Sequence, residues 1–187
     1  MLSFYGIILM GDIMELRDVI ESRRSIRKYT DELVDENIIL EAIKYGIMAP
    51  SAHNRQPWKV KLIKGEDKDK IADALILKTQ DIPGHTGVHT AGVIKNVPYL
   101  LVIYYDEIEG ANREHDLLSL GAFIEHIILY LTEAGLGTLW IANTNIVKEE
   151  VSDITGVNLE TISTIGIGVK DQDPKMRPRK DIEEIIL

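Results

Sequence analysis

Apolar residues recur along the chain at two spacings, one helical and one extended. Between residues 39 and 47 they follow the helical period, with Asp35 placed as an N-cap and Pro50 beyond the predicted helix end. Between residues 58 and 62 they alternate with lysines, which is the period of a strand with one solvated face. The polar stretch after Pro50 is therefore predicted to be a loop held between a helix and a strand.

The middle of the chain predicts a helix, a loop and a buried strand. Residues 66–77 have the pattern of an amphipathic helix. Residues 78–92 contain three Gly, one Pro and two His without periodicity, so we predict a loop, with a lid as one role for it. Residues 99–105 form a continuous apolar run, which is expected of a strand buried on both faces. That strand is the predicted centre of the sheet.

A long helix is predicted from residue 116 to residue 134. Its apolar side chains extend beyond one stripe, because Phe123, Leu129 and Tyr130 lie off it. A helix that is apolar on nearly all sides has to be buried on nearly all sides. We therefore expect a partner subunit to cover one side of it, and Gly135 to end it as a left-handed cap.

The last third of the chain predicts two further strands, at residues 137–142 and 161–169, and an apolar tail at 182–187 that needs a surface to dock on. No internal repeat, low-complexity tract or linker interrupts the pattern. We predict one mixed α and β domain over residues 14–187.

Residues 1–13 precede this domain as an N-terminal extension. They lack the basic region and cleavage site of a signal peptide and are shorter than the ~20 apolar residues that cross a bilayer. Three interpretations stay open: a start codon placed too far upstream, a flexible extension, or an arm that packs on a neighbour.

Composition excludes several classes of function. The chain has 187 residues, 45% of them hydrophobic, which is enough for one core. Its net charge of −9 disfavours nucleic acid and anionic membranes as partners. The absence of cysteine excludes disulfides and thiolate metal ligands and fits a reducing compartment. We predict a cytoplasmic protein.

Two short segments carry the candidate chemistry. Residues 23–27 read Arg-Arg-Ser-Ile-Arg, and guanidinium groups match phosphate oxygens in pairs. Residues 50–58 read Pro-Ser-Ala-His-Asn-Arg-Gln-Pro-Trp, whose small polar groups can hydrogen-bond the edge of a flat heterocycle. Together they predict a cofactor with a phosphate tail and a polar ring. The basic segment alone would equally fit a solvated helix end.

Four blocks, in order, resemble the nitroreductase family, flavoproteins that bind FMN at the interface of a homodimer. They are the basic pair, Ser and Arg of 23–27, Pro-Ser-x-x-Asn-x-Gln-Pro-Trp at 50–58, Gly-Leu-Gly-Thr-x-Trp-Ile at 135–141, and Arg-Pro-Arg-Lys at 177–180. Each block is weak alone. In family order they extend the resemblance from about Met14 to the C-terminus.

The resemblance implies a fold and an assembly. It implies an α+β, three-layer α/β/α fold with a central mixed, mostly antiparallel sheet, and a C-terminal segment exchanged onto the partner subunit of a homodimer. The chain departs from the family pattern at Ser119, Glu125 and His126 of the long helix, where relatives often carry Asp and Gln-Asn. These departures affect details of the interface.

The resemblance also implies roles for basic residues. Arg23, Ser25 and Arg179 are the predicted phosphate ligands, with Arg24 and Arg177 nearby. A phosphate monoester carries about −1.5 to −2 charges, which need charged donors when buried. Arg27 is expected at the pyrimidine edge of the flavin, where a cation stabilises the reduced anion and tunes the reduction.

The remaining predicted flavin contacts come from the second block, contributed by the other subunit, and from the end of the third block. They are Pro50, Ser51, Ala52, Asn54, Gln56 and Ala142. Gln56 is expected mainly to orient its loop. No side chain is assigned as catalytic, because flavin N5 carries the hydride.

The implied function is an FMN-dependent oxidoreductase that takes hydride from NAD(P)H and reduces nitroaromatics, quinones or similar electron-poor acceptors by a ping-pong mechanism. One alternative is a flavin-binding protein that stores, senses or consumes FMN without an external acceptor. A second alternative is a binding module that anchors a phosphate without any flavin. Both alternatives stay open because a fold by itself does not determine function.

Other motifs are interpreted as structural. His85 and His89 have the spacing of helical metal ligands, but their neighbouring glycines favour loop histidines, and no metal is predicted. Gly166-Ile167-Gly168 lacks the third glycine of a dinucleotide fingerprint, so a nicotinamide dinucleotide is expected only as a passing substrate. Trp58 and Trp140 are interpreted as core residues.

Overall fold

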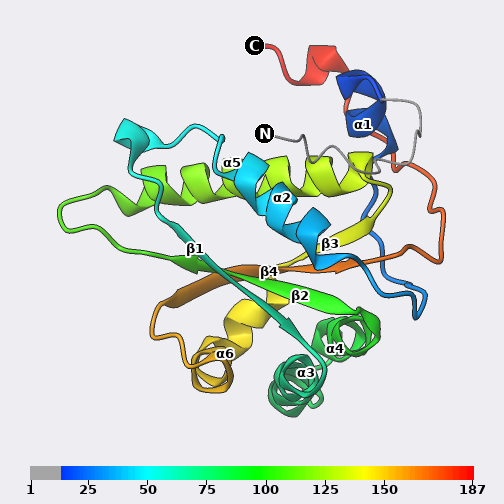
Figure 1. Cartoon of the computed structure of the whole chain (residues 1–187), viewed down its shortest axis with the longest axis vertical. Coiled ribbons are helices and arrows are strands. Elements are labelled where there is room, and N and C mark those ends of the chain that lie inside the picture. The colour runs from blue at the N-terminus through cyan, green and yellow to red at the C-terminus, as the bar shows by residue number, and fades with distance from the viewer. Residues whose placement is uncertain (1–13) are drawn as a thin grey trace, which may run out of the picture.

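The computed structural model describes residues 14–187, which form a three-layer α+β fold around one sheet (Figure 1). Its strands are β1 (Trp58–Lys64), β2 (Tyr99–Tyr105), β3 (Gly137–Ile141) and β4 (Glu160–Gly168). They pair in the order β1-β2-β4-β3, and every neighbouring pair is antiparallel. The predicted three-layer α+β fold is confirmed, as is the central place of the apolar strand β2. Exchange of the C-terminal segment onto a partner stays a prediction. The predictions for residues 1–13 lie outside the described residues.

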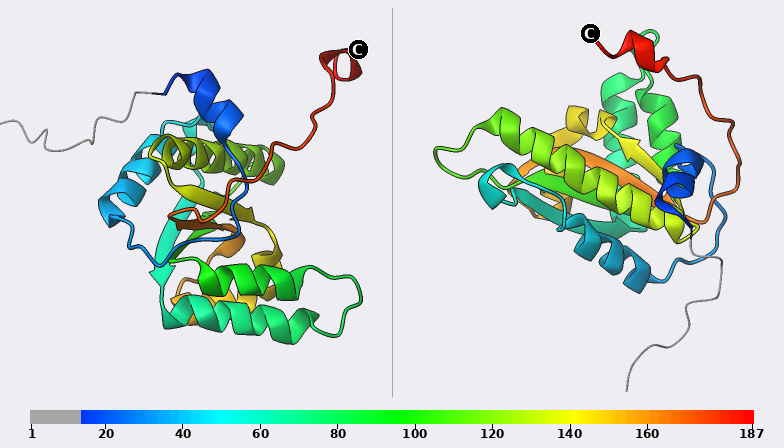
Figure 2. Two further views of the ribbon diagram at one scale, coloured as in Figure 1. Left: turned by 90° about the vertical axis from the view of Figure 1, so that its right-hand side faces the viewer. Right: turned by 90° about the horizontal axis from the view of Figure 1, so that it is seen from above.

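Helices cover both faces of the sheet (Figure 1). On one face lie α2 (Glu36–Gly46) and α5 (Arg113–Glu133), and on the other lie α3 (Glu66–Thr79), α4 (Gly87–Asn96) and α6 (Lys148–Thr155). The helix α1 (Leu16–Ser22) lies beside the C-terminal end of α5 (Figures 1 and 2). Short 3-10 turns occur at η1 (Ala52–Asn54), η2 (Asn143–Val147) and η3 (Ile182–Glu184). Within residues 14–187, no helix is both long and apolar enough to span a membrane.

The continuous apolar run of β2 follows from its place between two cores. Leu101 and Ile103 point to the core under α5, whereas Leu100 and Val102 point to the core under α3 and α4. Alternate side chains of a strand lie on opposite faces. Because both faces are covered, every residue of β2 is buried, and the hydroxyls of its three tyrosines all have hydrogen-bond partners.

The long helix α5 packs against the sheet and is crossed closely by α2. A Cβ atom at Gly46 would lie only 2.7 Å from Cγ1 of Ile127, so the glycine allows the two helices to approach. On its outward side, Leu118 is 75% exposed. The left-handed conformation predicted for Gly135 is confirmed by its φ of +79°. Coverage of the outward side by a partner subunit stays a prediction.

The predicted loop at residues 78–92 is wrong in its extent. The helix α3 continues to Thr79 and α4 begins at Gly87, which leaves only residues 80–86 as a connection. A Cβ atom at Gly87 would lie 2.2 Å from Oγ1 of Thr79, so the glycine that suggested a loop instead permits close packing of a helical hairpin. Only residues 80–86 are therefore left to form a lid.

We expect Gly87→Ala to destabilise the fold by about 1–3 kcal/mol, because the added methyl group overlaps Thr79 in the hairpin. The measurement is the free energy of unfolding in urea. The matched control is Gly92→Ala in the same helix, where a Cβ atom meets nothing within 4 Å. That control should be neutral or stabilise by up to about 1 kcal/mol. Equal effects of the two substitutions would contradict this account of the hairpin.

Candidate functional site

The predicted phosphate-binding segment lies along the edge of the sheet. After α1 the chain runs beside β3, where the amide of Ile26 donates to the carbonyl oxygen of Thr138 at 2.8 Å and Ser25 forms a parallel bridge with the same residue. This is the one parallel pairing among residues 14–187. A Cβ atom at Gly137 would lie 2.9 Å from Cγ2 of Ile26, so the second glycine of the third block makes room for this segment.

A half-buried tyrosine helps to hold the same segment in place. The hydroxyl of Tyr29 donates to the carbonyl oxygen of Ile26 at 2.8 Å. Burial raises the pKa of Tyr29, opposed only by the nearby charge of Arg27, so the hydroxyl stays protonated and remains a donor. Its ring packs on Gly168, where a Cβ atom would lie 2.9 Å from the tyrosine ring. The two-glycine motif of β4 is therefore a packing feature.

The two ends of the chain meet at the basic segment. The guanidinium group of Arg24 donates to the carbonyl oxygen of Pro174 at 3.1 Å, and the amide of Asp171 donates to the carbonyl oxygen of Lys28 at 2.9 Å. Beyond this contact, Arg177 and Arg179 are exposed on a tail that extends away from the body (Figure 2). A phosphate clamp that includes Arg179 stays a prediction.

The charges of this segment are available to a ligand. In the described part of the chain, the guanidinium groups of Arg23, Arg24 and Arg27 meet no carboxylate within 4 Å. Arg27 is exposed, and its one hydrogen bond is to the carbonyl oxygen of Ser25 at 3.2 Å. Three cations and a hydroxyl suit a phosphate monoester of about −1.5 to −2 charges.

The second predicted block forms a tightly turned loop at the other end of the long helix. Three non-glycine residues of this loop have a left-handed backbone conformation: the φ angles are +53° at His53, +56° at Asn54 and +52° at Gln56. Such conformations are costly and persist where the surroundings enforce them. The hydroxyl of Ser51 accepts from the Gln56 amide at 3.1 Å, and the Gln56 side chain donates to Oδ1 of Asn54 at 3.3 Å. These bonds fit the predicted role of Gln56 in orienting the loop.

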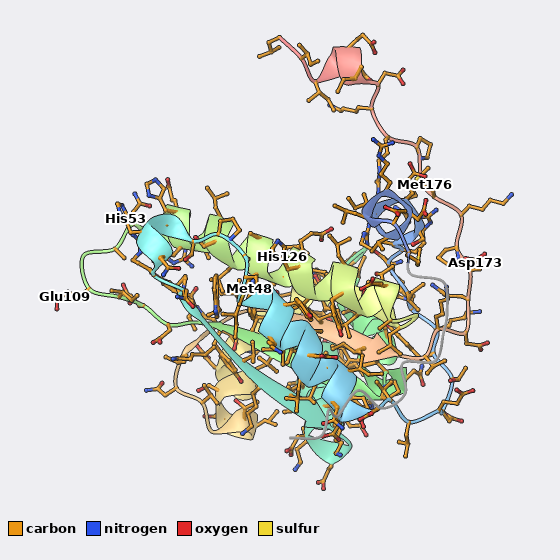
Figure 3. The ribbon with its side chains drawn as sticks, turned by 45° about the horizontal axis from the view of Figure 1, so that its top comes forward. Met48, His53, Glu109, His126, Asp173 and Met176 are labelled. Atoms are coloured by element: carbon orange, nitrogen blue, oxygen red, sulfur yellow. The ribbon has the colours of Figure 1, made fainter. Side chains whose placement is uncertain are left out.

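This loop lines a hollow of about 330 Å³ against the N-terminal half of α5. The predicted residues Pro50, Ser51 and Ala52 form its loop side. Figure 3 shows His53 at the tip of the same loop, beside the start of the long helix. The α5 side is lined by His115, Leu118, Ser119 and Ala122. Three predicted flavin contacts therefore share one concave surface.

The two predicted halves of the site are far apart within one chain. The loop contacts α5 at Ser119, whereas the basic segment lies beside β3, which follows the end of α5 at Glu133 (Figure 2). Ser119 and Glu133 are about 20 Å apart along α5, because a helix rises about 1.5 Å per residue. One chain does not bring the two blocks together.

The third block follows the edge strand away from the basic segment. Ala142 is exposed directly after β3, and the side-chain amide of Asn143 donates to the hydroxyls of Thr86 and Thr90 at 3.0 and 2.9 Å. These bonds attach the end of β3 to the beginning of α4. The exposed backbone at Ala142 suits the predicted contact, which stays a prediction.

Trp140 is a candidate site residue that the sequence interpretation missed. It was expected in the core, yet its side chain is 44% exposed, and its indole N–H donates to Oγ of Ser163 at 3.1 Å. It lies on β3 between Thr138, which pairs with the basic segment, and Ala142. Nothing in the local pattern shows that β3 is an edge strand, so its exposure could not be read from the sequence. Trp58, by contrast, is buried and stacks on Phe123 as expected.

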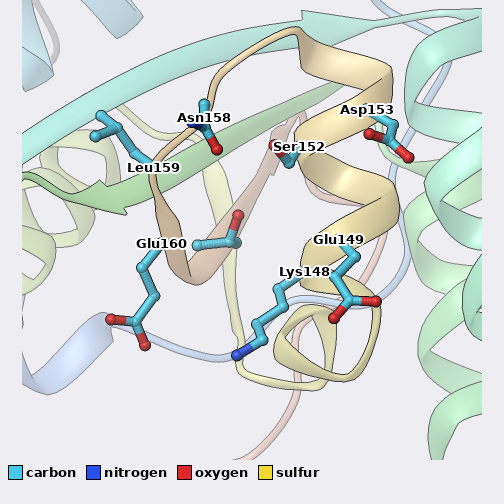
Figure 4. Close-up of a pocket in the computed structure, with 8 residues that line it drawn as sticks. Lys148, Glu149, Ser152, Asp153, Asn158, Leu159 and Glu160 are labelled. Carbon is cyan, nitrogen blue, oxygen red and sulfur yellow. The ribbon is translucent and has the colours of Figure 1, made fainter.

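Other candidate features lie apart from these two halves. A second hollow of about 370 Å³ lies between α6 and the start of β4, on the opposite side of the sheet from α5, and none of the predicted site residues lines it (Figure 4). The ring nitrogen of His85 accepts from the Gly87 amide at 2.9 Å, and His89 lies exposed on α4. No group of three metal-ligating side chains occurs among the described residues.

Comparison with known proteins identifies the family. The profile of the nitroreductase family matches residues 20–169, and the chain belongs to that family. It is 25% identical over 177 residues to a Bacillus subtilis protein named "Putative NAD(P)H nitroreductase YfhC", covering 90% of this chain and 91% of that protein.

Solved structures agree with this assignment. The nitroreductase-like family protein of Bacillus cereus is 26% identical, with a TM-score of 0.79 over 95% of this chain and 97% of that chain. A Desulfovibrio desulfuricans protein, solved in complex with FMN, has a TM-score of 0.77 at 23% identity, over 92% of this chain and 95% of that chain. The fold is therefore that of nitroreductases.

We expect Gly137→Val to push the basic segment away from β3, because a side chain there overlaps Ile26. The hydrogen bond from the Ile26 amide to Thr138 should break, and stability should fall by about 1–3 kcal/mol. Hydrogen exchange at the Ile26 amide measures this directly. Gly92→Ala, in open space on α4, should leave that amide protected. Unchanged protection in Gly137→Val would show that the close approach is not required.

Proposed function

We propose that the protein is a cytoplasmic, homodimeric, FMN-dependent oxidoreductase that takes hydride from NAD(P)H and reduces nitroaromatics, quinones or similar electron-poor acceptors. Membership of the nitroreductase family supports the reaction class. The observation that carries the proposal is the division of the predicted flavin site into two halves at opposite ends of α5. Such a division makes sense when a second copy supplies the missing half.

A twofold dimer would complete two sites at once. In such a dimer the same surface of both copies meets, so contacts occur in reciprocal pairs. If the α5 helices run in opposite directions across the interface, the loop of one copy meets the basic segment of its partner. The outward Leu118, exposed in one chain, would then be covered, as expected for a helix that is apolar on so many sides.

Exposed apolar side chains near α5 and in the tail support the same assembly. Stable interfaces bury at least about 1,000 Å² and need apolar residues near their centre. The exposed apolar residues of α1, α5 and the tail are Leu16, Ile20, Leu118, Met176, Ile182, Ile185, Ile186 and Leu187. We propose that the tail crosses onto the partner subunit, because it extends away from its own domain (Figure 2).

The residues of this chain suit FMN. Arg23, Ser25 and Arg24 would hold its phosphate, with Arg177 and Arg179 added from the tail. Their charge offsets the desolvation of a dianion. Pro50, Ser51, Ala52 and Asn54 would border the ring, with the polar groups bonding its edge and Gln56 fixing the loop. Trp140 and the backbone at Ala142 would lie beside the ring on the other subunit.

When bound, FMN supplies a carrier of two electrons that accepts and returns hydride. Arg27 would place its positive charge at the pyrimidine edge and so favour the reduced form. The protein would further contribute geometry, by leaving one ring face open for donor and acceptor in turn. Because no acidic side chain is assigned next to the ring, water supplies the proton to the acceptor.

The decisive measurement is the spectrum of the purified full-length protein. We expect a visible flavin absorption band, bleaching on anaerobic addition of NADH or NADPH, and return of the band on addition of a quinone or nitroaromatic compound. A band that neither nicotinamide bleaches would favour storage or sensing of FMN. A colourless protein that does not bind added FMN and sediments as a monomer would contradict the proposal.

We expect Arg27→Gln to keep FMN bound but to slow its reduction by NADH by about tenfold or more, because the cation that favours the reduced form is lost. Stopped-flow absorbance measures the rate. Lys28→Gln removes the same charge from the next residue, which is also exposed, and should change the rate by less than about twofold. Equal slowing in both variants would assign the effect to general charge instead of the position of Arg27.

A further inference from the structure

The loop of residues 50–57 holds an unfavourable backbone conformation that its own hydrogen bonds do not explain. Three left-handed residues within four positions require anchors outside the loop. Its internal bonds, from Gln56 to Ser51 and to Asn54, move with the loop and do not attach it to the domain. The anchors must come from neighbouring elements.

The strongest anchor is a buried ion pair. Nε and Nη2 of Arg55 donate to Oδ1 of Asp116 at 2.9 and 2.6 Å. The Asp116 side chain is fully buried and that of Arg55 is 15% exposed. In every other ion pair of the described chain, the carboxylate side chain is exposed to water by a third or more. The Arg55–Asp116 pair is therefore the one pair among the described residues whose carboxylate is fully buried.

Two further bonds complete the anchor. The hydroxyl of Tyr105, at the end of β2, donates to Oδ2 of Asp116 at 3.2 Å. Burial, reinforced by this bond, raises the pKa of Tyr105, so its hydroxyl stays protonated. At the start of the turn, the Ala52 amide donates to Oγ of Ser119, which itself donates to the carbonyl oxygen of His115 at 2.8 Å. The loop is thus attached to both α5 and the sheet.

A buried ion pair is a poor device for stability, because an apolar pair of similar volume is often as stable. It does fix direction, because the planar guanidinium group donates to a carboxylate only in a defined geometry. Arg55 lies between Asn54 and Gln56, so the direction of its side chain determines where its neighbours point. The pair therefore controls the orientation of the loop more than the stability of the fold.

We propose that Asp116 is a positioning residue for the flavin: through Arg55, and supported by Tyr105, it holds Ser51 and Asn54 where they border the ring in the partner's half of the site. This inference rests on the proposed function. It adds a residue that makes no contact with the flavin and that lies outside the four sequence blocks.

The test is FMN binding by the full-length protein after removal of its flavin. In Arg55→Met combined with Asp116→Leu, both charges are replaced by apolar groups, so no buried charge is left unpaired. We expect a folded protein whose urea midpoint falls modestly, because the buried hydroxyl of Tyr105 loses its acceptor. The Kd for FMN should rise about tenfold or more, because the loop is no longer preorganised. At saturating FMN, the absorption maximum should move towards that of free FMN, which a role in stability alone would not cause.

The matched control is Lys78→Met combined with Glu150→Leu. This pair is also close, at 2.7 Å, but it is partly exposed and joins α3 to α6 on the face of the sheet opposite α5. Its Kd and spectrum should stay those of the wild type. If the first double variant does not fold, Arg55→Lys takes its place, because lysine keeps the charge and loses the planar geometry.

The outcomes separate this inference from the proposed function. Wild-type affinity and spectrum in a folded Arg55 and Asp116 variant overturn the positioning role and leave the proposed function intact. A wild-type protein that does not bind FMN overturns both.

Discussion

The length and rigidity of the helix α5 set the distance between the two halves of the candidate site. It spans about 30 Å, and it places the polar loop at its beginning and the edge strand with its basic segment beyond its end. A rigid rod of this length keeps the two halves of the candidate site apart in one chain. Its outward side exposes Leu118, and this is the surface at which we propose that a second chain brings the halves together. Under that proposal, separation and assembly have one physical cause.

Close approach of backbones positions the basic half of the site. Gly137 and Gly168 have no side chains where Ile26, Tyr29 and Pro98 pack. The segment after α1 can then lie against β3 and share its hydrogen bonds. Successive side chains of an extended segment point to opposite sides. Ile26 is therefore buried in the core, whereas Ser25 and Arg27 stay accessible to a ligand. These glycines therefore allow the segment that carries the arginines to lie against the rigid strand β3.

The polar half of the site is positioned by charge instead. A fully buried carboxylate costs free energy unless it is paired and hydrogen-bonded. Asp116 has both kinds of partner, one from the loop and one from β2. The three left-handed residues of the loop flank Arg55, which joins the loop to this network. The left-handed backbone of these residues costs free energy, and such costly conformations are common at functional sites.

Local patterns in the sequence were enough to predict most of the fold and the family. Periodic apolar residues predict α2, α5 and the four strands because burial on one or two faces leaves a local record along the chain. Motif blocks indicated the family for a similar reason, since they are short and contiguous. The helix α4 was missed because glycines that serve close packing look, in a sequence, like glycines of a loop.

The arrangement of the candidate site, in contrast, became visible in the folded chain. It showed that Trp140 is half exposed at an edge, that residues 23–27 and 50–58 lie at opposite ends of α5, and that Arg55 meets Asp116, 61 positions along the chain. These facts depend on strand order and on contacts between residues far apart in sequence. No local pattern records them, because each residue carries information about its own burial and none about which distant group will lie beside it.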